Sequence, residues 1–137
     1  MKRSHFLIII ICCLTGWGAY YFAKLCFSRA YYNRGIALAK NELYEESISF
    51  YEKAIKWEPR YVEAWCSKAI AFFRLGKYDE ALKAVERATE LAPDYPFVWN
   101  SKAWLLETLG RKEEAKEAYK RMAACKKSRA AKNKIKL

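Results

Sequence analysis

The sequence predicts an all-α protein made of tandem antiparallel helical hairpins, an α-solenoid, preceded by a single hydrophobic helix. Three observations predict this fold. The chain matches itself at an offset of 34 residues, apolar residues recur at helical spacing within each repeat, and an uncharged apolar run precedes the repeats. The 137 residues are enough for one small domain plus short terminal segments.

The first element is the uncharged run FLIIIICCLTGWGAYYFA at residues 6–23. As a helix it would be about 27 Å long, close to the ~30 Å hydrocarbon core of a bilayer. Aromatic residues gather at its end, where membrane headgroups favour them, and Lys2 and Arg3 precede it. We therefore expect residues 1–27 to form a membrane anchor, with residues 6–23 as a single transmembrane span.

Two other interpretations of this run stay open. A cleaved signal peptide would have Lys2 and Arg3 as its basic start and Gly16-x-Gly18 as its cleavage site, although the apolar run continues past Gly18. Cleavage would release an exported soluble protein. A soluble helix is the third interpretation, and the apolar stretch at residues 8–11, which has no polar face, argues against it.

Charge and cysteine content weakly favour the cytoplasmic side for the domain behind the anchor. The cations soon after the run outnumber the two before it, and they are Lys24, Arg29, Arg34 and Lys40. The five cysteines are odd in number, and no C-x-x-C pair accompanies a histidine, so neither a disulfide framework nor a zinc site is indicated. Free thiols suit a reducing compartment.

The basic residues concentrate at the two ends of the chain. Residues 1–41 have six Lys/Arg and no acid, residues 42–117 have twelve Lys/Arg and all fifteen acids, and residues 118–137 have eight Lys/Arg and no acid. These give +6, −3 and +8, which sum to the net charge of +11. Such a distribution does not by itself indicate a nucleic-acid surface.

The basic C-terminal tail, residues 128–137, has three interpretations. With the two lysines before it, the tail reads KKSRAAKNKIKL. It can be a solvated helix end or a contact with an anionic membrane surface. It can also bind nucleic acid, which its lack of aromatic residues disfavours.

The repeat is visible as similar residues at positions 34 residues apart. Pro59 aligns with Pro93, and Gly76 with Gly110. Aromatic and small residues align in threes, and these are Tyr31/Trp65/Trp99, Gly35/Ala69/Ala103 and Ser47/Ala81/Ala115. The small residues let two helices approach closely, and the glycines can end helices in the left-handed conformation. The predicted helices are 29–40, 45–57, 62–75, 79–91, 96–109 and 113–128.

This pattern resembles the tetratricopeptide repeat over residues 28–127, in units at 28–61, 62–95 and 96–127. The resemblance implies stacked hairpins whose apolar faces only neighbouring units can cover. The third unit departs from the family pattern at Lys112, Met122 and Lys127. A more polar last helix suits a terminal unit, which has no following neighbour.

The resemblance also implies a concave groove, lined by the first helix of each unit, that binds a peptide or helix. The candidate partner-binding residues at the matching positions are Tyr32, Asn33, Ile36, Lys40, Cys66, Ser67, Ile70, Phe73, Arg74, Asn100, Ser101 and Trp104. Family members that clamp a carboxylate terminus have Asn where this chain has Ile36, Ile70 and Trp104, which argues against that mode of binding.

The candidate groove is apolar with a basic edge at Lys40 and Arg74, and it suits an apolar helix or extended segment with acidic flanks. We expect Trp104 to be partly exposed on the concave side, near Ile70 and Phe73, and its removal to change stability little. The alternative is that the isoleucines and Phe73 are simply buried between helices.

Nothing in the sequence indicates catalysis. It contains no Gly-rich phosphate loop, H-E-x-x-H, G-x-S-x-G or calcium loop, so no enzyme activity, metal or cofactor is expected. We predict a membrane-anchored scaffold for a protein or peptide partner. The alternatives are an exported soluble repeat protein, or a protein whose basic tail binds a membrane surface or RNA. The sequence does not set the oligomeric state.

Overall fold

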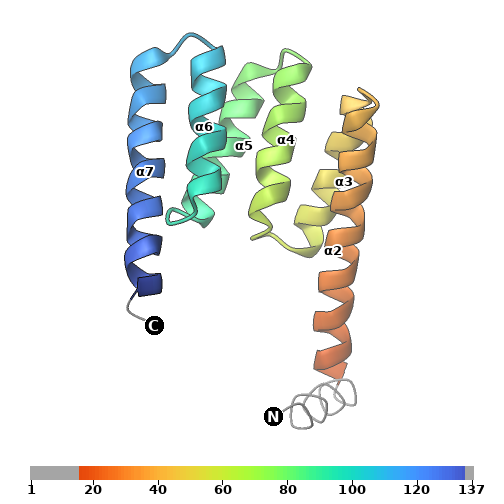
Figure 1. Ribbon diagram of the computed structural model, residues 1–137. Coiled ribbons are helices and arrows are strands. Elements are labelled where there is room, and N and C mark those ends of the chain that lie inside the picture. The colour runs from red at the N-terminus through yellow and green to blue at the C-terminus, as the bar shows by residue number, and fades with distance from the viewer. Residues whose placement is uncertain (1–15, 135–137) are drawn as a thin grey trace.

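The computed structural model describes residues 16–134, and within that range the chain forms helices joined by short turns (Figure 1). The helices are α2 (Gly16–Lys40), α3 (Tyr44–Trp57), α4 (Val62–Arg74), α5 (Tyr78–Leu91), α6 (Pro96–Thr108) and α7 (Lys112–Lys134). The predicted all-α solenoid of helical hairpins is confirmed.

The helices pack in two layers as three antiparallel hairpins, α2–α3, α4–α5 and α6–α7. The first helices of the hairpins, α2, α4 and α6, contact each other in order along the stack. Among the described helices, α3, α5 and α7 do not contact one another. The helices of the α2, α4 and α6 layer are therefore closer together than those of the α3, α5 and α7 layer. The stack curves towards the closer layer, so α2, α4 and α6 lie on its concave side.

Two helices are longer than the sequence predicted. α2 begins at Gly16 and passes through residues 27 and 28 without a break, because no Gly or Pro interrupts residues 19–34. α7 continues to Lys134 instead of ending at residue 128. Ala, Lys and Arg favour helix there, and no Gly or Pro follows Gly110.

The turns within the hairpins use one left-handed residue each. Gly76 and Gly110 have φ of 73° and 77°, as expected for glycines that end α4 and α6. The first hairpin has no glycine at this place. There Glu42, and not the neighbouring Asn41, takes the positive φ of 63°, a conformation that costs a side chain about 1–2 kcal/mol.

The small residues shared by the repeats lie where the helices of each hairpin meet. Ala81, Ala103 and Ser47 are fully buried, and Gly35, Ala69 and Ala115 are also buried. Larger side chains pack around them, among them Val85 and Leu105 in a cluster that joins α4, α5 and α6. The predicted close approach of the helices is confirmed.

Two polar contacts recur at the repeat spacing and join neighbouring elements. The indole nitrogen of Trp65 donates to the carbonyl oxygen of Pro59 at 3.0 Å, and Trp99 does the same to Pro93 at 2.7 Å. Each tryptophan thereby fixes the turn that precedes its own helix. Charged pairs also recur, since Lys68 contacts Glu52 at 2.9 Å and Lys102 approaches Glu86 to 4.0 Å.

Most of the expected transmembrane span, residues 6–15 of 6–23, lies outside the described residues. Within residues 16–134, no helix has an apolar stretch sufficient to cross a bilayer.

Candidate functional site

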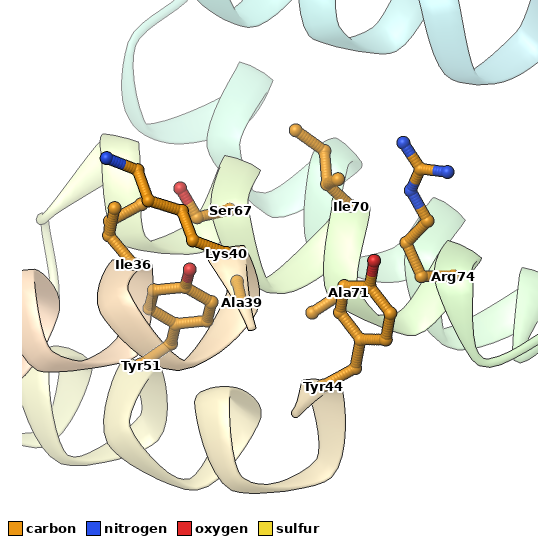
Figure 2. Close-up of a pocket in the computed structure, with 9 residues that line it drawn as sticks. All are labelled: Ile36, Ala39, Lys40, Tyr44, Tyr51, Ser67, Ile70, Ala71 and Arg74. Atoms are coloured by element: carbon orange, nitrogen blue, oxygen red, sulfur yellow. The ribbon is translucent and has the colours of Figure 1, made fainter. Parts of the chain in front are cut away.

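A pocket opens between the C-terminal halves of α2 and α4, on the concave side of the stack (Figure 2). Its volume is about 320 Å³. The residues that line it are Ile36, Ala39, Lys40, Tyr44, Tyr51, Ser67, Ile70, Ala71 and Arg74. We call this the α2–α4 pocket.

Helical spacing places the two walls of this pocket. Ile36 and Lys40 are four residues apart on α2, so they lie one above the other on one face. Ser67, Ile70 and Arg74 follow the same rule on α4. Ile70 is 38% exposed, which is high for an isoleucine in a helical layer. The walls therefore present apolar surface to solvent.

Two tyrosines from α3 close the bottom of the pocket between α2 and α4. Figure 2 shows Tyr44 and Tyr51 below the side chains of the two walls. Tyr51 is only 1% exposed, and its ring lies 5.9 Å from that of Tyr32. Burial, with Tyr32 adding to it, raises the pKa of Tyr51 to about 12. Its hydroxyl therefore stays protonated at neutral pH.

Two exposed cations border the pocket. Lys40 and Arg74 come from opposite walls, and Figure 2 shows their charged ends away from the tyrosines. In residues 16–134 neither has an ion-pair partner within 4.0 Å. Their charges are available to an anionic group on a bound molecule.

Five of the twelve predicted site residues line the α2–α4 pocket, namely Ile36, Lys40, Ser67, Ile70 and Arg74. Tyr32 lies beside it, half-buried, with its hydroxyl 3.4 Å from that of Ser67. Asn33 is exposed elsewhere on α2. Cys66 does not reach the pocket, because it is fully buried against Ala88 and Val98.

The predicted residues nearer α6 form a separate group. Trp104 is half-buried and packs on Phe73, with ring centroids 5.3 Å apart and planes at 70°. Both rings also pack on the buried cluster that joins α4, α5 and α6. Asn100 is exposed, and the Ser101 hydroxyl donates to the backbone oxygen of Phe97 at 3.0 Å. These residues do not line the α2–α4 pocket.

Sequence reasoning missed the tyrosines because it placed the groove on first helices alone. A signal was present, since Gly35 stands where the other repeats have Ala69 and Ala103. The missing methyl group leaves room for the Tyr51 ring, which contacts Gly35. The described part of the chain contains no cluster of three or more His, Cys, Asp or Glu that could hold a metal ion.

The fold and its pocket define a class of protein, the α-solenoids built from helical hairpins with a binding surface on the inner layer. The sequence profile described as "Tetratricopeptide repeat" matches residues 28–61 and 62–95, and a second profile of the same description matches residues 98–122. The chain belongs to the tetratricopeptide repeat family. A comparison with curated proteins found no match.

Solved structures of the same fold resemble the chain at low sequence identity. "Crystal structure of MamA" has a TM-score of 0.68 at 22% identity, over 76% of this chain and 61% of that one. "First TPR of Spaghetti (RPAP3) bound to HSP90 peptide SRMEEVD" has a TM-score of 0.66 at 25% identity, over 72% of this chain and 79% of that one. "Arabidopsis OM64 TPR domain" has a TM-score of 0.67 at 19% identity, over 82% of this chain and 97% of that one. The chain thus matches about three-fifths of the length of MamA.

Proposed function

We propose that the protein is an interaction scaffold without catalysis of its own, which binds a peptide or helix with an apolar centre and acidic flanks in the α2–α4 pocket. The observation that carries this proposal is the combination of apolar surface at the half-buried Ile36 and the exposed Ile70 with two cations at the border, Lys40 and Arg74, that have no ion-pair partner among the described residues. Apolar contacts would supply affinity, and the cations would select the flanks and speed association.

Solved structures of similar folds support the choice of a peptide as ligand. The first and second TPR domains of Spaghetti were solved bound to the HSP90 peptide SRMEEVD. The α2–α4 pocket differs in chemistry from a site for terminal carboxylates, because it presents Ile36 and Ile70 at the positions discussed above. An apolar centre therefore fits this pocket better than a terminal carboxylate does.

We further propose that residues 6–23 hold the scaffold on a membrane, with the repeats on the cytoplasmic side. The apolar composition of these residues supports this, as does the exposure of Tyr20, Tyr21 and Phe22 at the start of α2. The full chain should resist alkaline carbonate extraction, and N-terminal sequencing should find residues before Gly18. A mature chain beginning at Ala19 would instead support the exported alternative.

Fluorescence anisotropy with a defined peptide panel tests the pocket. The panel contains a leucine-rich peptide with Asp/Glu flanks, the same peptide with Lys flanks, and SRMEEVD. The acidic-flanked peptide should bind tightest, because it matches both the apolar walls and the cations. Ile70→Ser should weaken it by about tenfold or more, the scale of a moderate hot spot. Preference for the basic-flanked peptide or for SRMEEVD would contradict the proposed ligand chemistry.

Two matched variants control this measurement. Phe97 is 41% exposed, close to the 38% of Ile70, but it does not line the pocket. Phe97→Ser should therefore leave the affinity nearly unchanged. Lys40→Gln with Arg74→Gln should slow association and reduce its salt dependence, since border charges act mainly on encounter. Equal losses from Ile70→Ser and Phe97→Ser would place recognition outside the pocket.

A further inference from the structure

Both ends of the described chain project from the same end of the stack (Figure 1). Lys24 of α2 contacts Glu58 in the α3–α4 turn at 3.1 Å, so the residues before Lys24 extend past that turn. Near the other terminus, the Cys125 thiol of α7 donates to the Pro93 oxygen in the α5–α6 turn at 3.3 Å. The residues after Cys125 therefore pass that turn in the same direction.

The projecting end of α2 exposes aromatic side chains in several directions. Tyr20, Tyr21 and Phe22 are 61%, 62% and 68% exposed. Successive residues of a helix point about 100° apart, so these three side chains face three directions. A protein partner docked on one face would leave at least one of them in water. The interfacial region of a membrane, which surrounds a helix, can accommodate all three.

The projecting end of α7 is cationic. Lys126, Lys127, Arg129 and Lys132 are exposed, and no acidic residue follows Glu117 in the sequence. Arg129 lies 5.8 Å over the Tyr95 ring. Among the described residues, no ion pair involves the three lysines. Their positive charge is therefore not neutralised within the structure.

The opposite end of the stack has mixed charge, because its acidic pairs lie among the cations Lys40, Arg74, Lys77, Arg111 and Lys112. The first turns of α3, α5 and α7 each begin with an acidic pair, and all three turns lie at the end away from the projecting helices. The pairs are Glu45/Glu46, Asp79/Glu80 and Glu113/Glu114. An anionic surface would therefore attract the end of α7, which has cations and no acid, more strongly than this end.

We infer that the cationic end of α7 binds the anionic headgroups of the same membrane that holds the start of α2. This inference rests on the membrane attachment proposed above, and it adds a second point of contact in the third hairpin, at the other side of the stack from the first. Lipid headgroups are favoured over nucleic acid for two reasons. The apolar end of α2 projects from the stack in the same direction as the end of α7, and α7 has no aromatic residue after Tyr119 for base stacking.

Two contacts fix how the repeats stand on the membrane, with the helices steep to its surface. Ile36 and Lys40 are about 16–20 residues beyond Tyr20 on α2, which places the α2–α4 pocket roughly 25–30 Å along the helix from the headgroups. At that height the pocket faces the aqueous phase. Its occupant is therefore a segment of a soluble partner or of a long extramembrane region.

Hydrogen exchange of the full chain in vesicles tests the second contact. The vesicles contain phosphatidylcholine alone, or phosphatidylcholine with about one-third phosphatidylserine. In the phosphatidylserine vesicles, exchange in residues 123–134 should slow by about tenfold or more, since each lysine near such a surface contributes about fivefold. High salt should reverse the effect. Residues 16–27 should be protected in both kinds of vesicle.

Matched triple variants assign this protection to the end of α7. Lys126→Gln with Lys127→Gln and Lys132→Gln should abolish it, with Arg129 kept because it packs on Tyr95. Lys77→Gln with Lys83→Gln and Lys112→Gln removes the same charge from exposed positions nearer the opposite end of the stack, and should preserve the protection of residues 123–134.

Each remaining outcome separates the two contacts. Protection of residues 16–27 without any effect of phosphatidylserine on residues 123–134 would overturn the second contact and leave the anchor intact. Lack of protection of residues 16–27 in both vesicles would overturn the anchor itself, and with it the shared membrane. Protection of residues 123–134 by single-stranded RNA without vesicles, as strong as that by phosphatidylserine, would overturn the assignment to lipid.

Discussion

The ring of Tyr51 lies directly against Gly35, so that a β-carbon at residue 35 would be 2.6 Å from Tyr51 Cε1. The same β-carbon would lie 3.2 Å from the backbone oxygen of Ser47. Tyr51 is only 1% exposed and packs against residues of α2 and α4, among them Ile36 and Ala71. This contact sets how closely α2 and α3 approach, and it positions the bottom of the α2–α4 pocket.

Gly35→Ala should lower the free energy of unfolding by about 1–3 kcal/mol, because the methyl group overpacks a buried contact. The sign of the change in the free energy of unfolding shows whether residue 35 is crowded. In an uncrowded helix the same change should stabilise by roughly 0.5–1 kcal/mol, since glycine is a poor helix former. Urea unfolding followed by circular dichroism measures the difference. A stabilised variant would show that Tyr51 moves freely.

Glu42→Gly should raise the free energy of unfolding by about 0.5–1 kcal/mol. Glu42 has a φ of 63°, which a side chain disfavours, while glycine adopts it freely at some entropic cost. Gly76→Ala is the opposite change at the equivalent turn, and it should destabilise although open space surrounds it. Urea midpoints of the two variants should move in opposite directions, and a common direction would contradict the strain at residue 42.

Cys66 should make stability fall at alkaline pH. Burial raises the pKa of its thiol from 9.0 to about 12, the nearby Ser101 hydroxyl lowers this pKa, and the charge of Glu63 adds to the rise. A raised pKa means that the unfolded chain loses the proton first. Stability is therefore full below about pH 9 and is lost as the pH rises from 9 towards 12.

Thermal unfolding between pH 8 and 10 measures this slope. Cys66→Ala should flatten it, because Tyr51, with its pKa raised from 10.0 to about 12, begins to contribute only above pH 10. Iodoacetamide at pH 8 should also modify the exposed Cys26 in the native protein and spare Cys66. Rapid alkylation of native Cys66 would be inconsistent with its burial.

Trp104→Ala should lower the free energy of unfolding by about 1–3 kcal/mol, less than a fully buried tryptophan would cost. The sequence alone suggested little effect, but the contact with Phe73 joins α4 to α6. Ile70→Ser, at a more exposed residue, should cost less than ~1 kcal/mol. Guanidinium unfolding compares the two. If Trp104→Ala is as stable as the parent, the contact between Trp104 and Phe73 does not contribute to stability, and Trp104 is free to bind a ligand.

The repeat, the small residues and most helix bounds could be predicted because they are set locally. Apolar spacing fixes which face of each helix is buried, and Ala81 or Gly76 then has one compatible role. The continuity of α2 could not be predicted, since a domain boundary was inferred from a change of composition that does not interrupt a helix. Nor could the place of Tyr51, because it depends on contacts between three helices.

Trp104 shows the limit for the candidate site. Family position placed it on the inner layer correctly, but the same position serves either a ligand or the neighbouring helix. The structure shows the contact of Trp104 with Phe73 on the neighbouring helix. Cys66 is a similar case, because a small residue at a groove position can turn towards Ala88 and Val98 without any change in pattern.

The unbroken path of α2 has a mechanical consequence. The helix that supplies Ile36 and Lys40 to the pocket is the same one that begins at Gly16, with no joint between. A force on an occupant of the pocket would be transmitted along the α2 axis to Gly16, because no flexible segment interrupts the helix between them. The protein is thus suited to hold its ligand at a fixed distance and orientation relative to Gly16. A flexible linker at the same place would let the ligand change its orientation.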